Sequence, residues 1–470
     1  MHAKINACYI ISTIIFFMKG CNLMHRKLLL ISALLALSFA SASCAGTHNY
    51  TAGDVIVVLS EQDNSGTFRA SEFASGEGLE VRKVYSALSE NSGSVFALIH
   101  SDDIDPETYA QELMNNPNVI AASPNYIVMA ASVTPNDTYW QNLWGLHTIN
   151  MPEVWETEKG SDSVYVAIID SGIDWTNEDL SSNVVSELGK NTLNSLANAM
   201  DDYGHGTHVA GTIGALSNNN FGVTGINWNV KMIPIKALDN QGYGSTDTVI
   251  AGINYVIDLL NQGYNIRVVN LSLETYASYK PDSYSDMQSF PLWHAFKNLD
   301  NINKTVIVSA AGNNNATIGH ETTRYKYGSN GIIFRPGEYV YPASFTGINN
   351  LISVSAMNYN GKVASYSNTN ASISAPGGES SGEKILSTWP SARFSSRDGS
   401  KLSEAFGTSM ASPHVAGVAA LLSAHNSSMT AYQIKQCILE TRNNNYAEGL
   451  LDAAAALKYQ DSQGTSLDKE

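Results

Sequence analysis

Short apolar runs without polar alternation recur through the C-terminal two-thirds of the chain. The clearest runs are residues 164–169, 231–237, 267–273, 305–310 and 351–356. A strand has this composition when helices cover both faces of its sheet. These segments therefore predict the strands of a buried parallel sheet.

Helical patterns lie between these runs. In residues 246–260 the apolar side chains fall on one stripe, at Ile250, Ile253, Val256, Ile257 and Leu260. This spacing predicts an amphipathic helix. Residues 411–422 are small or apolar nearly all round and predict a helix buried in the core. Alternating strands and helices indicate an α/β fold, a three-layer doubly wound parallel sheet.

A separate small domain is expected at residues 45–131. Residues 54–59 and 94–99 are strand-like, and Asp105-Pro106 starts a helical pattern with proline at its first position. Another strand is expected from Val119. Strands and helices alternating over this length predict an α+β domain of the split βαβ, ferredoxin-like type.

The N-terminus has the pattern of an export signal. A basic segment, residues 25–27, precedes an apolar run at residues 28–40 that is too short to span a bilayer. We expect residues 1–44 to be a signal peptide, with Met24 as an alternative start. Lipid attachment at Cys44, which follows a relaxed lipobox pattern, and ordinary cleavage after Ala42 both fit these residues.

Charge and cysteine content narrow the function classes. Lys and Arg total 27 and Asp and Glu total 43, so the net charge is −16. An acidic surface repels polyphosphate, which argues against nucleic acid as a partner. Cys437 is the one cysteine outside the N-terminal region, so the body cannot contain an intrachain disulfide. We expect it to be a buried thiol, and we expect disorder at residues 459–470.

Three motifs place an acid, a base and a nucleophile on separate elements. They are Ala-Ile-Ile-Asp170-Ser-Gly-Ile-Asp, Gly-His205-Gly-Thr-His-Val-Ala-Gly and Gly-Thr-Ser409-Met-Ala-Ser-Pro-His-Val-Ala-Gly. Singly, such an Asp is most often a turn residue, such a His is structural and such a Ser is a helix cap. Together, in the order Asp, His, Ser, they match one of the unrelated orders of a serine-protease triad.

These motifs resemble those of the subtilisin-like serine proteases (subtilases, peptidase S8), over roughly residues 133–458. The resemblance implies that Ser409 is the nucleophile, His205 the general base and Asp170 the group that orients His205. It also implies that Asn313, in Ala-Ala-Gly312-Asn313, donates to the oxyanion. Substitution of Asn313 should then cost on the order of a hundred- to a thousandfold in turnover.

The resemblance extends to the small N-terminal domain. Asn116-Pro117-Asn118-Val119, followed by Pro124-Asn125, is similar to the end of an inhibitor I9-type subtilase propeptide. Such a propeptide is an intramolecular chaperone and inhibitor. Processing is expected between Met129 and Thr134, leaving a catalytic domain of residues 132–458. An unrelated binding domain is the alternative interpretation of residues 45–131.

Three segments match the family's substrate-binding edges, where a peptide adds as a strand. They are Gly242, Tyr243 and Gly244; Ser272, Leu273 and Glu274; and Ala311 and Gly312. The family pattern has glycine where this chain has Glu274. Two interpretations stay open: a carboxylate beside the primary pocket that favours basic residues, or a glutamate turned to solvent. Broad specificity is the default expectation.

The resemblance also implies structural Ca²⁺. The loop at residues 216–223 is rich in asparagine, and calcium prefers six to eight oxygen ligands, many of them carbonyls. The residues that match the family's site are Asp137, Asp179, Leu216, Asn218, Phe221 and Val223. An ordinary surface turn is the alternative. Zinc is disfavoured, because His205 and His208 lack the spacing and glutamate of metalloprotease motifs.

The sequence therefore predicts a secreted, monomeric serine endopeptidase that acts on proteins or peptides. It would be made as a self-processing precursor with its own propeptide as inhibitor. Activity should rise as His205 loses its proton near pH 7. A catalytically silent binding protein of the same fold is the alternative. An α/β-hydrolase is excluded, because Ser409 lacks the second glycine of that nucleophile turn and the triad order differs. The inserts at residues 274–293 and 317–341 have no assigned role.

Overall fold

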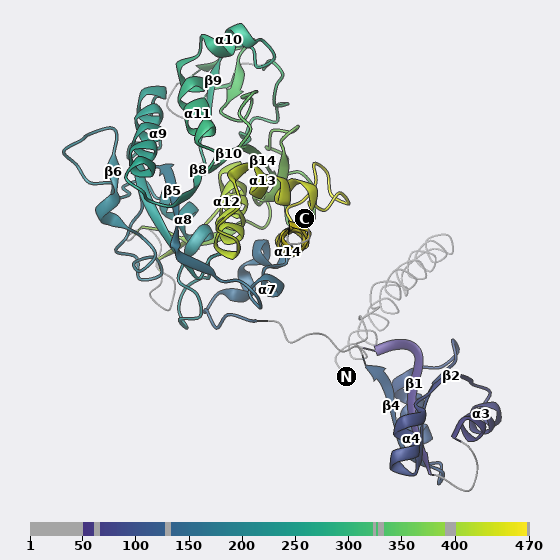
Figure 1. Ribbon diagram of the computed structural model, residues 1–470. Helices are drawn as coiled ribbons and strands as arrows, with labels where there is room; N and C mark the ends of the chain where they lie inside the picture. Colours follow the sequence, from purple (N-terminus) through teal and green to yellow (C-terminus); the bar gives the residue numbers. More distant parts are fainter. Residues whose placement is uncertain are drawn as a thin grey trace, which may run out of the picture. The chain divides into compact units, whose positions relative to one another are not determined.

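The computed structural model describes residues 50–60, 66–126, 133–322, 326–327, 333–390 and 401–467. It divides into two compact units, Met1–Ala130 and Ala131–Glu470 (Figure 1). The predicted signal peptide and most of the predicted processing segment lie outside the described residues. Within the described part, no helix has the length and apolarity needed to cross a bilayer.

The first unit is a four-stranded antiparallel sheet with helices. Its elements are β1 (Tyr50–Ser60), α3 (Gly66–Gly76), β2 (Glu80–Val84), α4 (Ser86–Ser92), β3 (Ser94–His100), α5 (Pro106–Leu113) and β4 (Val119–Tyr126). The strand order β2-β3-β1-β4 is that of a ferredoxin-like sandwich. Alternate residues of β1 and β3, such as Val55, Val57 and Ile99, are buried, because one face of an antiparallel sheet packs on the core.

The second unit is built on a seven-stranded parallel sheet. Its order is β15-β14-β10-β8-β5-β7-β6. The strands are β5 (Gly160–Asp170), β6 (Lys190–Asn191), β7 (Asn229–Lys236), β8 (Ile266–Leu271), β10 (Val306–Ala310), β14 (Leu351–Met357) and β15 (Ile373–Pro376). The five predicted runs are five of these strands, and β8, β10 and β14 are buried throughout. The prediction of a parallel sheet is confirmed.

Helices cover both faces of this sheet. On one face α12 (Thr408–His425) lies against β5, β8, β10 and β14, with α8 (His205–Gly214) beside it (Figure 1). On the other face α9 (Thr246–Asn261) and α11 (Pro291–Ile302) pack together. Two separate hydrophobic clusters, one for each face, form the core. The three-layer α/β prediction is confirmed.

Shorter elements complete the unit. They are η2 (Trp140–Asn142), α6 (Trp144–Thr148), α7 (Met151–Val154), η3 (Ser186–Leu188), β9 (Thr275–Ala277), α10 (Tyr284–Gln288), β11 (Lys326–Tyr327), β12 (Ile333–Phe334), β13 (Tyr339–Tyr341), β16 (Ile385–Thr388), β17 (Leu402–Ala405), α13 (Ala431–Glu440) and α14 (Ala453–Leu467). Cys437, on α13, is a buried free thiol, and burial raises its pKa to about 11. The prediction of an inert, structural cysteine agrees with this environment.

The predicted disorder after residue 458 is wrong for the residues that the structure describes. Helix α14 continues to Leu467. Gln460 is buried and donates from Nε2 to the carbonyl oxygen of Leu422 at 2.9 Å, and Asp461 accepts from His425 at 2.7 Å. The segment is polar, but these contacts with α12 supply partners that its sequence pattern alone does not show.

Candidate active site

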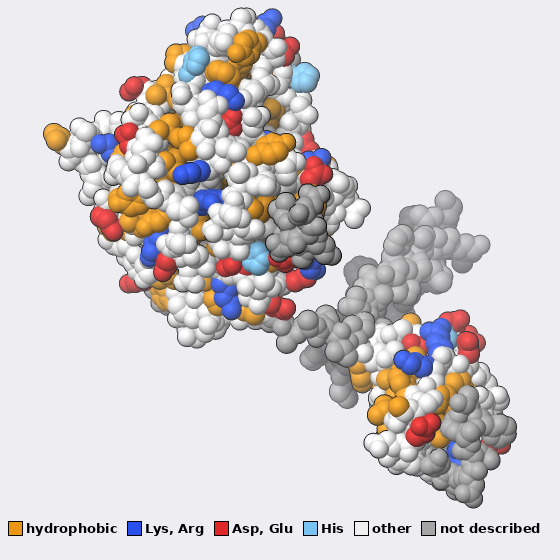
Figure 2. Space-filling view, in the orientation of Figure 1, with side chains coloured by type: hydrophobic (Ala, Val, Ile, Leu, Met, Phe, Trp, Pro, Cys, Tyr) orange, Lys and Arg blue, Asp and Glu red, His pale blue; other side chains and the backbone are white. Residues whose placement is uncertain are grey.

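A cleft of about 560 Å³ lies at the carboxyl edge of the parallel sheet. Strands β8 and β10 end just before Ser272 and Gly312, which line it, while α8 and α12 begin with His205 and Thr408. In an open α/β sheet this edge is where ligands bind. On the face of the unit shown in Figure 2, acidic and basic side chains are interspersed rather than gathered into one basic patch.

Asp170 and His205 are hydrogen-bonded. Asp170 is the last residue of β5 and its side chain is fully buried, while 23% of the His205 side chain is exposed. His205 Nδ1 lies 2.8 Å from Oδ1 and 3.0 Å from Oδ2 of Asp170. A carboxylate in this position fixes the imidazole with its proton on Nδ1, which leaves Nε2 as the basic nitrogen.

The pKa of His205 is raised above its ordinary value. Burial lowers it, but the charge and hydrogen bond of Asp170 and the charge of Asp201 together raise it by more. His205 therefore keeps its proton to a higher pH than an ordinary histidine.

Asp201 is a site residue that the sequence analysis missed. It is buried, and it accepts from the Thr207 amide at 3.0 Å, the Gly204 amide at 2.9 Å and the Ser171 hydroxyl at 2.9 Å. The Ser171 hydroxyl in turn accepts from the Gly206 amide at 2.9 Å. These bonds hold the start of α8 against the end of β5. The signal available was the Asp201-Asp202 pair just before the His205 motif.

Ser409 lies in the first turn of α12 and lines the same cleft as His205. Its Oγ donates to the carbonyl oxygen of Ser272 at 3.1 Å rather than to His205. Catalytic hydrogen bonds are often long or misaligned before substrate binds. The structure thus places nucleophile and base in one cleft, with the hydroxyl turned toward the substrate-binding edge.

A proline inside α12 explains a second contact between the same two segments. Pro413 has no N–H, so the carbonyl of Ser409, four residues earlier, loses its helical partner. The Ser272 hydroxyl donates to that carbonyl at 2.9 Å. The pair of bonds between Ser272 and Ser409 therefore fixes the nucleophile against the end of β8.

Asn313 is held by the residue before the nucleophile. Its Oδ1 accepts from the Thr408 amide at 2.9 Å and from the Thr408 hydroxyl at 3.1 Å. Because the amide is planar, these two bonds fix the plane of the Asn313 side chain. Gly407, with φ of 149° and ψ of 162°, adopts a backbone conformation that only glycine takes readily.

Seven of the eight predicted substrate-binding residues line the cleft. They are Gly242, Tyr243, Gly244, Ser272, Leu273, Glu274 and Gly312. Ala311 is not among the residues that line it. It is fully buried with Val340, and its carbonyl accepts from Asn368 at 2.8 Å, so its backbone is already committed behind the cleft. Glu274 is half-buried, which argues against the solvent-facing interpretation.

The structure also brings the predicted calcium residues together. Asp137 Oδ2 accepts from the Asn218 amide at 2.8 Å, and Asp179 Oδ2 accepts from the Val223 amide at 2.7 Å. The loop carrying Leu216 is bonded through its backbone to Asp179 at 2.7 Å. Asp137 Oδ1 is buried without a hydrogen-bond partner, as a cation ligand would be. The donor set, two carboxylates beside a loop of carbonyls, fits calcium.

In the described ranges, no group of three or more His, Cys, Asp or Glu side chains gathers as a metal site. A calcium site of two carboxylates and backbone carbonyls is not of that type. The loop also contains Asn219, whose side chain donates to Asp179 Oδ1 at 2.8 Å.

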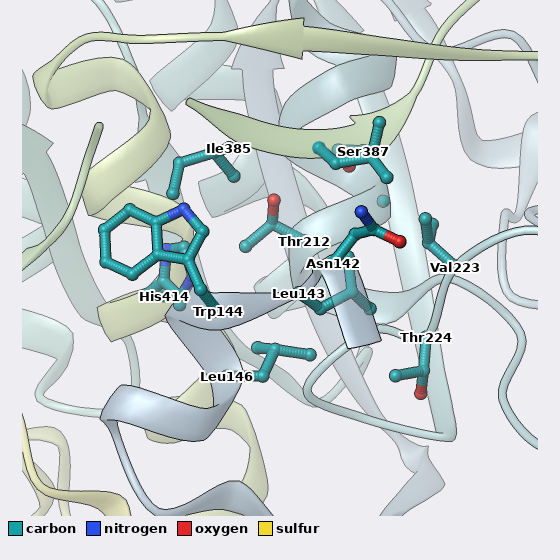
Figure 3. A pocket seen from close by; sticks show the side chains of 13 residues that line it. Asn142, Leu143, Trp144, Leu146, Thr212, Val223, Thr224, Ile385, Ser387 and His414 are labelled. Atoms are coloured by element: carbon teal, nitrogen blue, oxygen red, sulfur yellow. The ribbon is translucent and has the colours of Figure 1, made fainter. Parts of the chain in front are cut away.

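Two further histidines lie in the interior. Burial lowers the pKa of His208 to about 3 and that of His414 to about 4, so both are neutral. His414 lines a pocket of about 20 Å³ with Trp144 and Leu146, space for about one water molecule (Figure 3). His208 and His414 are buried in the core and do not line the cleft.

The comparisons with known proteins agree with this geometry. Residues 161–464, which contain Asp170, His205, Asn313 and Ser409, match the family described as the subtilase family. The chain is 33% identical over 395 residues to "Thermophilic serine proteinase" of Bacillus sp. (strain AK1), covering 83% of this chain and 82% of the relative. It is 29% identical over 440 residues to "Alkaline protease" of Alkalihalobacillus alcalophilus, covering 92% and 97%.

A solved structure titled "Proteases from Pseudoalteromonas arctica PAMC 21717" shares the fold. It superposes with a TM-score of 0.54 at 27% sequence identity. The match covers 70% of this chain and 100% of that one.

Proposed function

Because the chain belongs to the subtilase family of serine endopeptidases, we propose that it hydrolyses peptide bonds with Asp170, His205 and Ser409. The observation that carries this proposal is the 2.8 Å bond between His205 and Asp170, in a cleft that His205 and Ser409 both line. The raised pKa of His205 supports the role of a base whose activity is lost as the pH falls through that pKa.

In the proposed reaction, His205 Nε2 takes the proton of the Ser409 hydroxyl as Oγ attacks the peptide carbonyl carbon. Asp170 stabilises the imidazolium that forms. The Asn313 side-chain amide and the Ser409 backbone N–H donate to the oxyanion. His205 then protonates the leaving amine, and water hydrolyses the acyl-enzyme by the same steps in reverse order.

We further propose that the first unit is a propeptide that the enzyme removes from itself. The ferredoxin-like sheet of β1 to β4 supports this. So does the 440-residue match to the alkaline protease, which is longer than the second unit alone and so includes part of the first. Self-removal would cut between Met129 and Thr134 and give a monomeric mature enzyme of residues 132 onward.

The test is Ser409→Ala in the full chain. Purified wild-type precursor should shorten to a product starting near residue 132, and it should be labelled by a fluorophosphonate probe. The variant should keep its full length and lose peptide hydrolysis by on the order of 10⁵-fold or more, because the nucleophile is absent. Maturation of the pure variant would overturn self-processing. An unlabelled, inactive wild type would favour the silent binding protein.

The proposal includes export through the N-terminal segment, with Cys44 as a site of lipid attachment or Ala42 as the last residue removed. A lipid on Cys44 would be carried by the propeptide, so self-cleavage would release the catalytic unit. Membrane fractionation of wild type and Ser409→Ala tests this. Identical partitioning of the catalytic unit in both would refute release.

A structural calcium ion is part of the proposal. Asp137, Asp179, the Asn218 side chain and the carbonyls of Leu216, Phe221 and Val223 would hold it, and the ion would tie the segment at Asp137 to the loop. Since a ligand bound only to the native state stabilises it, chelation should lower the melting temperature by on the order of 10 °C. Asp137→Asn should lower it without chelator. An unmoved melting temperature in both cases would exclude the site.

A further inference from the structure

Glu274 lies in the substrate-binding edge where the family pattern has glycine, and its carboxylate has defined partners. Oε2 accepts from the backbone N–H of Asn313 at 3.2 Å and from the Tyr276 hydroxyl at 3.2 Å. Oε1 accepts from Asn314 Nδ2 at 3.5 Å. The carboxylate therefore lies at the cleft wall beside the residue that would hold the oxyanion.

The backbone beside this carboxylate has room for it only because residue 312 is glycine. A Cβ on Gly312 would lie 2.3 Å from Glu274 Oε2, far inside van der Waals contact. Gly312 also has φ of 99°, which side chains rarely adopt. The Glu274 side chain therefore packs against the backbone that follows β10 and has a defined position there.

The two inserts that had no assigned role support this position. Tyr276 lies on β9, in the first insert, and pairs with Val340 on β13, which is formed in the second. Burial and the charge of Glu274 raise the pKa of Tyr276, so its hydroxyl remains a donor at neutral pH. Asn368 supports the same segment, since its side-chain Oδ1 accepts from the backbone N–H of Asn314 at 3.1 Å.

The negative charge of Glu274 decides which substrate side chains this part of the cleft recognises. Glu274 is the only Asp or Glu among the described residues that line the cleft. A carboxylate beside the Asn313 N–H opposes the negative charge that develops on an oxyanion nearby. A cationic substrate side chain beside Glu274 offsets that effect, and a neutral one does not, because charges interact strongly in a partly buried site.

We propose that Glu274 is a specificity-determining residue that selects a basic side chain, an ammonium or guanidinium group, at the substrate position preceding the scissile bond (P1). The inference rests on the proposed function, since it places the P1 side chain beside Ser409 and Asn313. It replaces the expectation of broad specificity.

The test compares matched peptides that differ only in P1, lysine or norleucine, which has a similar length and no charge. Enzyme concentration is set by fluorophosphonate titration of wild type, Glu274→Gln and the control Glu404→Gln. Glu404 is exposed on β17 and does not line the cleft. Its substitution therefore changes the net charge by the same amount as Glu274→Gln without altering the cleft. In wild type, kcat/KM for lysine should exceed that for norleucine by about tenfold or more.

Glu274→Gln should reduce this ratio by about tenfold, and Glu404→Gln should leave it unchanged. A ratio unchanged by Glu274→Gln in probe-reactive enzyme would overturn the inference and leave the proposed function intact. If wild type neither reacts with the probe nor cleaves either peptide, the proposed function fails instead.

A measurement on wild type alone covers the case in which Glu274→Gln does not fold. Benzamidine, a cation, and benzamide, its neutral counterpart, are compared as competitive inhibitors of peptide hydrolysis. Benzamidine should bind at least about tenfold more tightly if Glu274 faces the P1 side chain. Equal inhibition constants, or inhibition by neither, would overturn the inference.

Discussion

Two carboxylates serve the same cleft from different elements and in different surroundings. Asp170 ends a buried strand and bonds to His205, an ionisable group of the protein itself. Glu274 follows β8 in a loop, is half-buried, and accepts from neutral donors, the Asn313 amide and the Tyr276 hydroxyl. The first acts on the enzyme's own base. The second lines the cleft, where its charge acts on the bound substrate.

The difference shows how one kind of side chain is given two tasks by its partners. A carboxylate that stabilises the imidazolium formed during the reaction affects every substrate alike, because it acts on the proton transfer. A charge supported by neutral donors distinguishes between substrates, because only a cationic side chain gains from it. Variants at the two sites should therefore separate rate from preference.

Asp170→Asn should have the largest effect. The amide cannot hold His205 in the required tautomer, so kcat should fall by on the order of 10⁴-fold. The fall should be equal for lysine and norleucine peptides, and their ratio should stay at the wild-type value. The measurement is kcat/KM for both peptides, with circular dichroism as the folding control. A changed ratio would mean that the two carboxylates do not have separate tasks.

The parts of this comparison differ in how far sequence could predict them. The apolar runs before Asp170 and Gly312 predicted strands β5 and β10, because buried parallel strands have a local signature. The bond between Asp201 and Ser171 could not be predicted, since the two residues lie 30 positions apart and meet only in the folded chain. Contacts between segments far apart in the sequence produce no periodic pattern from which they could be predicted.

The contacts around Glu274 were even harder to predict from the sequence. Its departure from the family pattern was visible in the sequence, and both a pocket-facing and a solvent-facing side chain were open. What decides between them is β9, whose pairing with β13 joins residues of the two inserts that lie more than 60 positions apart (Tyr276 with Val340). Three-residue strands have too short a pattern to predict, and they form here because tertiary packing holds them.

Asp201→Asn tests the surroundings of His205 and should have a smaller effect than Asp170→Asn. Asp201 raises the pKa of His205, so removing its charge should lower that pKa and shift the acid limb of the kcat/KM profile to lower pH. Because the amide NH₂ would face backbone donors at Gly204 or Thr207, stability should fall by about 1–3 kcal/mol. Urea unfolding measures the second effect.

The matched control for this variant is Asp202→Asn. Asp202 is more exposed and pairs with Lys236 instead of bonding to the start of α8. Its removal should leave the acid limb in place. If both variants shift the limb equally, a general change in net charge is responsible, and Asp201 has no special relation to His205.

Tyr276→Phe should have the smallest effect and should act on the Glu274 side alone. Loss of the hydroxyl removes one donor to Oε2 and loosens the carboxylate, so the lysine-to-norleucine ratio should fall about two- to fivefold. Values for the norleucine peptide should change little, because Asp170 and His205 are untouched. Tyr284→Phe, at an exposed site on α10, is the control and should change neither. Equal loss for both peptides would show that Tyr276 supports the cleft without positioning Glu274.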